Sequence, residues 1–201
     1  MNSDTNKPIA GRVAEHNSWP AERGYAMEPD TVGMTELWDP RRRSGSPIRL
    51  GDILTVDRIK VPLAGSDSGQ VVRELVDLLV DAGEIVNGDP VAEAIVSRER
   101  VRSTGVGGQL AIPHARTAQV KKLTMALGTS PAPIDFDSID GAGVRIVVML
   151  LSPIEMTAQC IGVLNRIITM MNSAPVRSEL LEARSAGELY ETIRRHEAAA
   201  A

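Results

Sequence analysis

The first regular pattern in the chain appears after residue 50, where apolar residues recur with a helical period. Ser66 or Ser68 can cap a helix that Gly83 ends. The apolar face of this helix comprises Val71, Val72, Leu75, Val76 and Leu79. Asp89-Pro90 opens a second helix. This helix turns Val91, Ala94 and Ile95 inward and carries Arg98 to Arg100 at its end.

Short apolar runs follow the second helix and predict strands. A glycine-rich loop leads into Leu110-Ala111-Ile112, and further strands are expected at 123–127 and 144–151. The last of these is almost continuously apolar, which predicts a central strand covered on both faces. Asp137, Asp140 and Gly141 mark a polar turn between the two longer strands.

The C-terminal part of the chain predicts three more helices. A long helix follows Pro153, with an apolar stripe of Ile161, Leu164, Ile167, Ile168 and Met171. Ser173 with Pro175 starts a short helix, and the capping box Ser185-Ala186-Gly187-Glu188 starts the last one. Helices mixed with strands in this order predict an α/β fold, a sheet with helices packed on it.

The ends of the chain lack such patterns. Residues 1–48 are polar, contain five prolines and show no period, which predicts a disordered N-terminal tail before a domain at 49–197. The run Arg41-Arg42-Arg43 in this tail is best interpreted as a solvated linker, and Trp19 and Trp38 could dock on the domain or on a partner. Residues 198–201 are expected to fray.

Composition excludes several classes of protein. The 201 residues include 22 basic and 26 acidic side chains, for a net charge of -4, and aromatics make up only 2%. This composition disfavours nucleic acid as the main partner. No apolar stretch is long enough to enter a membrane, and the start of the chain lacks a signal-peptide core. Cys160 is the only cysteine, so an internal disulfide and a cysteine-based zinc site are excluded, and the cytoplasm is the expected compartment.

The candidate chemistry centres on His114. His16 and His196 lie in the tail and at the end of the last helix, whereas His114 follows Ile112-Pro113 directly after the glycine-rich loop. Six basic residues and one acidic residue lie between positions 98 and 122, in a chain whose net charge is negative. The backbone N–H groups of Gly105, Gly107 and Gly108 could approach an anion, although this segment matches neither the dinucleotide fingerprint nor a Walker loop. A neutral imidazole in this setting could attack phosphorus, and the simpler alternative is a histidine that caps a strand end.

Several separated motifs together resemble one known family. They are Arg98-Glu99-Arg100, Ser103-Thr104-Gly105, Ala111-Ile112-Pro113-His114, Pro133-Ile134-Asp135-Phe136-Asp137, and Pro153 before a long helix. In this order they are similar to the fructose/mannitol-type IIA domain of the phosphoenolpyruvate:sugar phosphotransferase system, including its nitrogen-regulatory members. The resemblance covers about residues 50–197. It implies a three-layer α/β sandwich, with a mixed sheet flanked by helices.

The resemblance also implies roles for individual residues. His114 matches the histidine that accepts phosphate from the histidine-containing phosphocarrier protein, and Arg98 matches the arginine beside the phosphoryl group. Sugar-transporting members carry a second histidine at the start of the long helix, where this chain has Cys160. The resemblance therefore implies a phosphoryl carrier that is regulatory or linked to sugar uptake, needs no cofactor or metal, and hands phosphate to a IIB domain or acts on a regulated partner protein.

Two other hypotheses remain open from the sequence. The chain could be a binding module that kept the IIA fold and lost phosphotransfer. A thiol enzyme built on Cys160 and His114 has little support, because a lone helical cysteine is usually a small buried hydrophobe.

Overall fold

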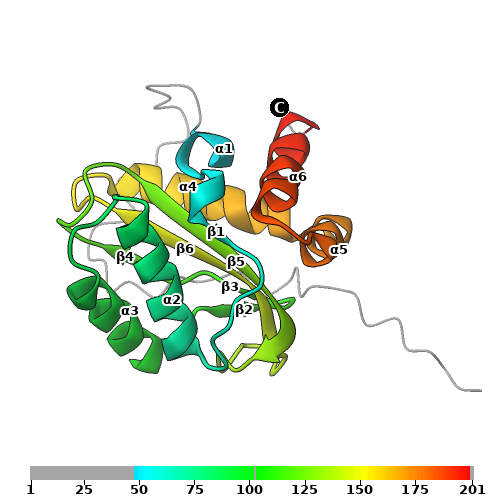
Figure 1. Ribbon diagram of the computed structural model, residues 1–201, viewed down its shortest axis with the longest axis horizontal. Coiled ribbons are helices and arrows are strands. Elements are labelled where there is room, and N and C mark those ends of the chain that lie inside the picture. The colour runs from blue at the N-terminus through cyan, green and yellow to red at the C-terminus, as the bar shows by residue number, and fades with distance from the viewer. Residues whose placement is uncertain (1–47, 102, 200–201) are drawn as a thin grey trace, which may run out of the picture.

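The computed structural model describes residues 48–101 and 103–199. The predicted tail, including His16, the two tryptophans and the arginine run at 41–43, lies outside these residues, as do Arg102 and residues 200–201. The described chain forms a mixed sheet covered by helices on both faces, which confirms the predicted three-layer α/β sandwich (Figure 1).

Six strands form the sheet. They are β1 (Ile59–Lys60), β2 (Gly105–Gly107), β3 (Leu110–Ala111), β4 (His114–Arg116), β5 (Thr124–Ile134) and β6 (Val144–Ser152). The order is β1-β5-β6-β3-β2, and β4 pairs with β6 beyond the end of β3. The pairs β1·β5, β3·β6 and β4·β6 are parallel, whereas β5·β6 and β2·β3 are antiparallel. Strand β6 is paired on both sides and almost wholly buried, so the prediction of a central strand is confirmed.

The helices divide between the two faces of the sheet. Helices α2 (Ser68–Asp81) and α3 (Asp89–Val101) cover one face, and the other carries α1 (Leu50–Ile53), α4 (Thr157–Met171), α5 (Ala174–Glu182) and α6 (Ala186–Ala199) (Figure 1). A 3-10 turn at Val56–Arg58 leads from α1 into β1. The last helix extends to Ala199, two residues beyond the boundary expected at Glu197.

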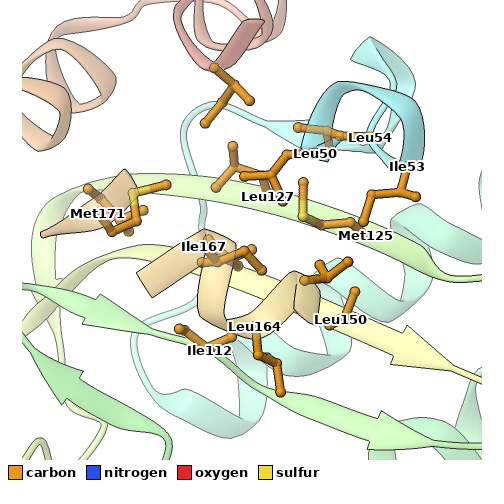
Figure 2. Packing of buried hydrophobic residues seen from close by; sticks show 14 of the residues in the cluster. Leu50, Ile53, Leu54, Ile112, Met125, Leu127, Leu150, Leu164, Ile167 and Met171 are labelled. Carbon is orange, nitrogen blue, oxygen red and sulfur yellow. The ribbon is translucent and has the colours of Figure 1, made fainter. Parts of the chain in front are cut away.

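Each face of the sheet has its own apolar core because successive strand residues point to opposite sides. In β6, Ile146, Val148 and Leu150 pack under α4, α5 and α6, while Val147, Met149 and Leu151 pack under α2 and α3. Figure 2 shows Leu164 and Ile167 of α4 among Met125, Leu127 and Leu150 of the sheet and Ile112, which follows β3. These two cores fix α3 and α4 on opposite sides of the same sheet.

Several local expectations differ from the structure. The α2 N-cap is Asp67, whose carboxylate accepts from Gln70 N at 2.9 Å, rather than Ser66 or Ser68. Ala94 is exposed and Ala92 faces the core instead, while Ile161 and Ile168 are only half-buried because Cys160 and Val163 share the inner face of α4. The glycine-rich segment expected as a loop contains strand β2, and β5 runs seven residues beyond its expected end at Leu127.

Candidate functional site

His114 begins strand β4, where the sequence predicted only the end of a strand. It stands opposite Leu150 of β6, and the carbonyl of Pro113 accepts from Leu150 N at 3.0 Å. Ala115 packs against the core under α2 and α3. Alternation along the strand therefore turns His114 and Arg116 toward the face that carries α4.

The chain just before His114 determines which ring nitrogen is available. Nδ1 of His114 lies 2.8 Å from the carbonyl oxygen of Ile112. A carbonyl can only accept, so Nδ1 carries the proton in the neutral ring. The lone pair then resides on Nε2, which makes Nε2 the nucleophilic atom of the site.

Arg98 is brought to His114 from the other face of the sheet. It lies in the last turn of α3, and its Nη1 is 3.4 Å from both Nδ1 and the backbone oxygen of His114. Since the Nδ1 proton points to Ile112, the guanidinium donates to the His114 oxygen and places its charge beside the ring. The predicted pairing of Arg98 with His114 therefore has a geometric basis.

Burial and the charge of Arg98 both act on the pKa of His114. Burial lowers the pKa from its ordinary 6.5, the positive charge of Arg98 lowers it further, and the hydrogen bond to Ile112 opposes them in part. The ring is thus held neutral at neutral pH, in the form that can attack an electrophile.

Glu99 fixes the end of α3 next to Arg98, and sequence reasoning assigned it no role. Its carboxylate accepts from Thr104 N at 2.6 Å, from the Thr104 hydroxyl at 2.7 Å and from the Ser103 hydroxyl at 3.2 Å. The Ser103 hydroxyl is also within hydrogen-bonding distance of the Phe136 carbonyl. The signal available in the sequence was the short spacing between Glu99 and the pair Ser103-Thr104, which allows one carboxylate to reach both hydroxyl groups.

The glycines predicted to contact phosphate lie elsewhere. Gly105 N donates to the Ser103 hydroxyl at 2.9 Å, and Gly108 N donates to Asp140 Oδ2 at 2.9 Å. Ala111 of β3 pairs with Val147 of β6, whereas His114 pairs with Leu150. At the usual strand rise, these two positions of β6 are about 10 Å apart. The structure therefore does not bring Gly105, Gly107 and Gly108 to His114, and they pack against the turn at residues 138–140 instead.

The α4 side of the site contains Arg116, Thr157 and Cys160. Arg116 Nη1 donates to the Thr157 hydroxyl at 3.3 Å. Cys160 is only 6% exposed and belongs to the core under α4. Burial raises the pKa of its thiol, and the hydrogen bond to Ser152 and the charges of Arg116 and Arg98 oppose this only in part. The thiol is therefore protonated, which removes the basis for a thiol enzyme at this position.

Two further properties concern the described residues as a whole. Within residues 48–101 and 103–199, no three histidine, cysteine or acidic side chains lie together as metal ligands. No helix of the described chain is both long and apolar enough to cross a bilayer.

Comparison with known proteins places this geometry in context. A sequence model of the phosphoenolpyruvate-dependent sugar phosphotransferase system, EIIA 2, matches residues 52–196. A nitrogen regulatory protein of Pseudomonas aeruginosa is 34% identical over 146 residues, covering 73% of this chain and 95% of that protein. The fructose-specific EIIABC component of Bacillus subtilis is 31% identical over 75% of this chain, which spans 24% of its length. The crystal structure of nitrogen regulatory protein IIA-Ntr from Neisseria meningitidis superposes with a TM-score of 0.66 at 29% identity, covering 71% of this chain and 97% of that one.

Proposed function

The chain belongs to the EIIA 2 family of the phosphoenolpyruvate-dependent sugar phosphotransferase system, and from this premise we propose that His114 carries a phosphoryl group on Nε2. The observation that carries the proposal is the 2.8 Å contact between Nδ1 and the Ile112 carbonyl, with the Arg98 guanidinium beside the same ring. Family membership supports a phosphocarrier or regulatory role, and this contact selects the atom that would bear the phosphoryl group.

The proposed step exchanges one nitrogen–phosphorus bond for another. The Nε2 lone pair of His114 attacks the phosphorus of a donor phosphohistidine, the new bond forms, and the donor nitrogen leaves with its electron pair. The Nδ1 proton stays on His114, where the Ile112 carbonyl stabilises the positive charge that develops on the ring. Because the two bonds are chemically alike, catalysis depends on positioning and on electrostatics.

Arg98 would supply the electrostatic part. A guanidinium remains charged at all physiological pH values and can donate to two phosphoryl oxygens at once. Its Nη1 lies 3.4 Å from Nδ1 of the His114 ring. We assign Arg98 the stabilisation of charge on the phosphoryl oxygens during transfer.

The partners follow from the same proposal. The donor is the histidine-containing phosphocarrier protein, and the acceptor is either a IIB domain or a protein whose binding depends on the phosphorylation state. Relatives of both kinds match this chain, a nitrogen regulatory protein and a fructose-specific component. With Cys160 where the resemblance places a second histidine, onward transfer would be slow, which favours the regulatory role. The reaction would take place in the cytoplasm and would use no metal or organic cofactor.

Incubation of the purified protein with phosphoenolpyruvate and the upstream phosphotransferase proteins tests the proposal. We expect label on one histidine, stable to base and labile to acid. A folded protein that takes up no label under conditions in which an authentic IIA domain is labelled would contradict the carrier function and favour the binding module.

A further inference from the structure

We infer that Arg116, held by the Thr157 hydroxyl, is a second phosphoryl-binding residue of this site, gripping the group on His114 from the α4 side. The inference rests on the proposed function, because it concerns the same phosphoryl group. It assigns to Arg116 and Thr157 the contact that the buried Cys160 cannot provide.

The strand places Arg116 within reach of that group. His114 and Arg116 are two residues apart in β4, so they share one face of the strand at a spacing of about 7 Å. The arginine stands opposite Ser152, the last residue of β6, just before the segment that leads into α4. A flexible side chain of this length can cover the distance back to the ring of its neighbour.

Thr157 orients the guanidinium. Its hydroxyl oxygen accepts from Arg116 Nη1 at 3.3 Å, while the hydroxyl proton goes to the Ile154 carbonyl at 3.2 Å. This contact uses one of the five N–H donors of arginine. Among residues 48–101 and 103–199 no carboxylate lies within ion-pair distance of Arg116, so the described part of the chain leaves this cation without a counter-ion.

Electrostatics at Cys160 agree with this placement. The charges of both Arg116 and Arg98 act on its thiol and lower its pKa against the larger effect of burial. Each guanidinium group is thus near enough to Cys160 for its charge to act on the thiol, Arg98 at the end of α3 and Arg116 in β4 beside Thr157 of α4. Of these two charges, that of Arg98 acts on the pKa of the His114 ring, so the contact proposed for Arg116 is with the phosphoryl group on Nε2 and not with the imidazole.

Cys160 does not offer an equivalent contact. Its side chain is 6% exposed and packs in the core under α4, and a thiol is a weak hydrogen-bond donor. Arginine, by contrast, donates strong charge-assisted hydrogen bonds to phosphate. On the α4 side, the contact to the phosphoryl group is thus assigned to Arg116 of β4 and not to Cys160 of α4.

The experiment compares four variants with the wild type: Arg116→Gln, Arg116→Lys, Thr157→Val and the control Arg100→Gln. Arg100 is an exposed arginine near the end of α3, so its substitution removes the same charge away from the proposed contact. One readout is the rate of labelling by the upstream carrier proteins. The other is the 31P titration midpoint of phosphohistidine formed chemically with phosphoramidate, which bypasses those proteins.

We expect Arg116→Gln to slow labelling about tenfold, as for one charge-assisted hydrogen bond in the transition state, and to raise the 31P midpoint. Arg116→Lys should restore part of both effects because it keeps the charge. Thr157→Val should slow labelling about threefold, since it only releases the guanidinium. Arg100→Gln should match the wild type in both readouts.

Three outcomes would overturn the inference. In the first, Arg116→Gln behaves like Arg100→Gln in both readouts. In the second, Arg116→Gln slows labelling, but the 31P midpoint does not move and Arg116→Lys does not restore the rate. In the third, phosphoramidate fails to label the wild type. Failure of the proposed function gives a different result. In that case the upstream carriers leave the wild type unlabelled while phosphoramidate labels it, and the 31P midpoints still decide the role of Arg116.

Discussion

The imidazole Nδ1 of His114 lies 2.8 Å from the carbonyl oxygen of Ile112, two residues earlier in the chain. Pro113 has no N–H, and its own carbonyl pairs with Leu150 N of β6. The strand edge therefore fixes both the backbone and the tautomer of His114. The reactive nitrogen is selected by local chain geometry before any partner arrives.

The first prediction is that His114→Ala abolishes labelling. His196, the other histidine of the described chain, has its Nε2 2.9 Å from Glu179 Oε2 and lies on α6. Labelling by the upstream phosphotransferase proteins, resolved by mass spectrometry, measures the effect, and His196→Ala is the control that should keep full labelling. Acid-stable label on Ser103, or label that survives in His114→Ala, would contradict the assignment.

The second prediction separates Arg98 from its neighbour on α3. Arg98→Ala should slow labelling about tenfold or more, roughly 1.4 kcal/mol of barrier, because it removes the cation beside the reacting ring. Arg100→Ala removes an equal charge from the exposed side of the same helix end and should have little effect. Equal small losses in both variants would indicate that these arginines only interact with the helix dipole.

The third prediction concerns pH. The pKa of His114 is lowered in the folded protein, by burial first and by Arg98 second, from 6.5 in the unfolded chain. Neutral His114 therefore contributes stability that is present above about pH 6.5 and is lost as the pH falls through the folded pKa. Labelling should stay constant from pH 8 to about 6.5 and fall only below that value.

An NMR titration of the His114 ring protons measures this pKa directly, with His114→Ala to assign the signals. In Arg98→Ala the midpoint should rise toward the ordinary value, since one of the two causes of the shift is gone. A midpoint above 6.5 in the wild type would contradict the described burial of the ring.

The sequence predicted the parts of this site that depend on local pattern. Strand β6 was recognisable from its continuous apolar run, and helix α3 from Asp89-Pro90 and the period that follows. The spacing of Arg98 and His114 in a family motif was also sufficient to pair them. These signals lie within single elements or in an ordered set of motifs.

The parts that could not be predicted depend on pairing between distant segments. Strand β4 has three residues after a proline and is defined by its partner β6, so no period reveals it. Gly105 and Gly108 suggested an anion-binding loop by composition, yet their N–H groups donate to the Ser103 hydroxyl and the Asp140 carboxylate. Only the fold shows which acceptor lies next to each backbone donor.

The fourth prediction tests the support of α3 by Glu99. Glu99→Gln keeps one oxygen as acceptor, and its amide group can only donate to the Thr104 hydroxyl, so the three hydrogen bonds lose their charged acceptor. We expect a loss of about 1–3 kcal/mol in the free energy of unfolding, because hydrogen bonds to a charged acceptor are stronger than those to a neutral amide. Labelling should also slow, though less than in Arg98→Ala, because Arg98 keeps its charge but loses its fixed position.

Glu93→Gln is the matched control, since Glu93 is exposed on the same helix. Chemical denaturation gives the free energy of unfolding, and the carrier assay gives the rate. A Glu99→Gln protein with wild-type stability would show that the end of α3 is held by other contacts.

The last prediction concerns Cys160, which the resemblance aligns with a second histidine. Its thiol is buried, and burial raises its pKa, so no thiolate is present to act as a nucleophile. Cys160→Ala and Cys160→Ser should therefore accept phosphate at the wild-type rate.

Cys160→His should speed transfer to a IIB domain, because the new imidazole would contact the phosphoryl group from α4. A quenched time course of labelling, run without and with a IIB acceptor, measures phosphate acceptance and onward transfer, and circular dichroism controls for folding. If the alanine and serine variants both fold and both fail to become labelled, Cys160 takes part in the reaction and the carrier mechanism through His114 and Arg98 alone is wrong.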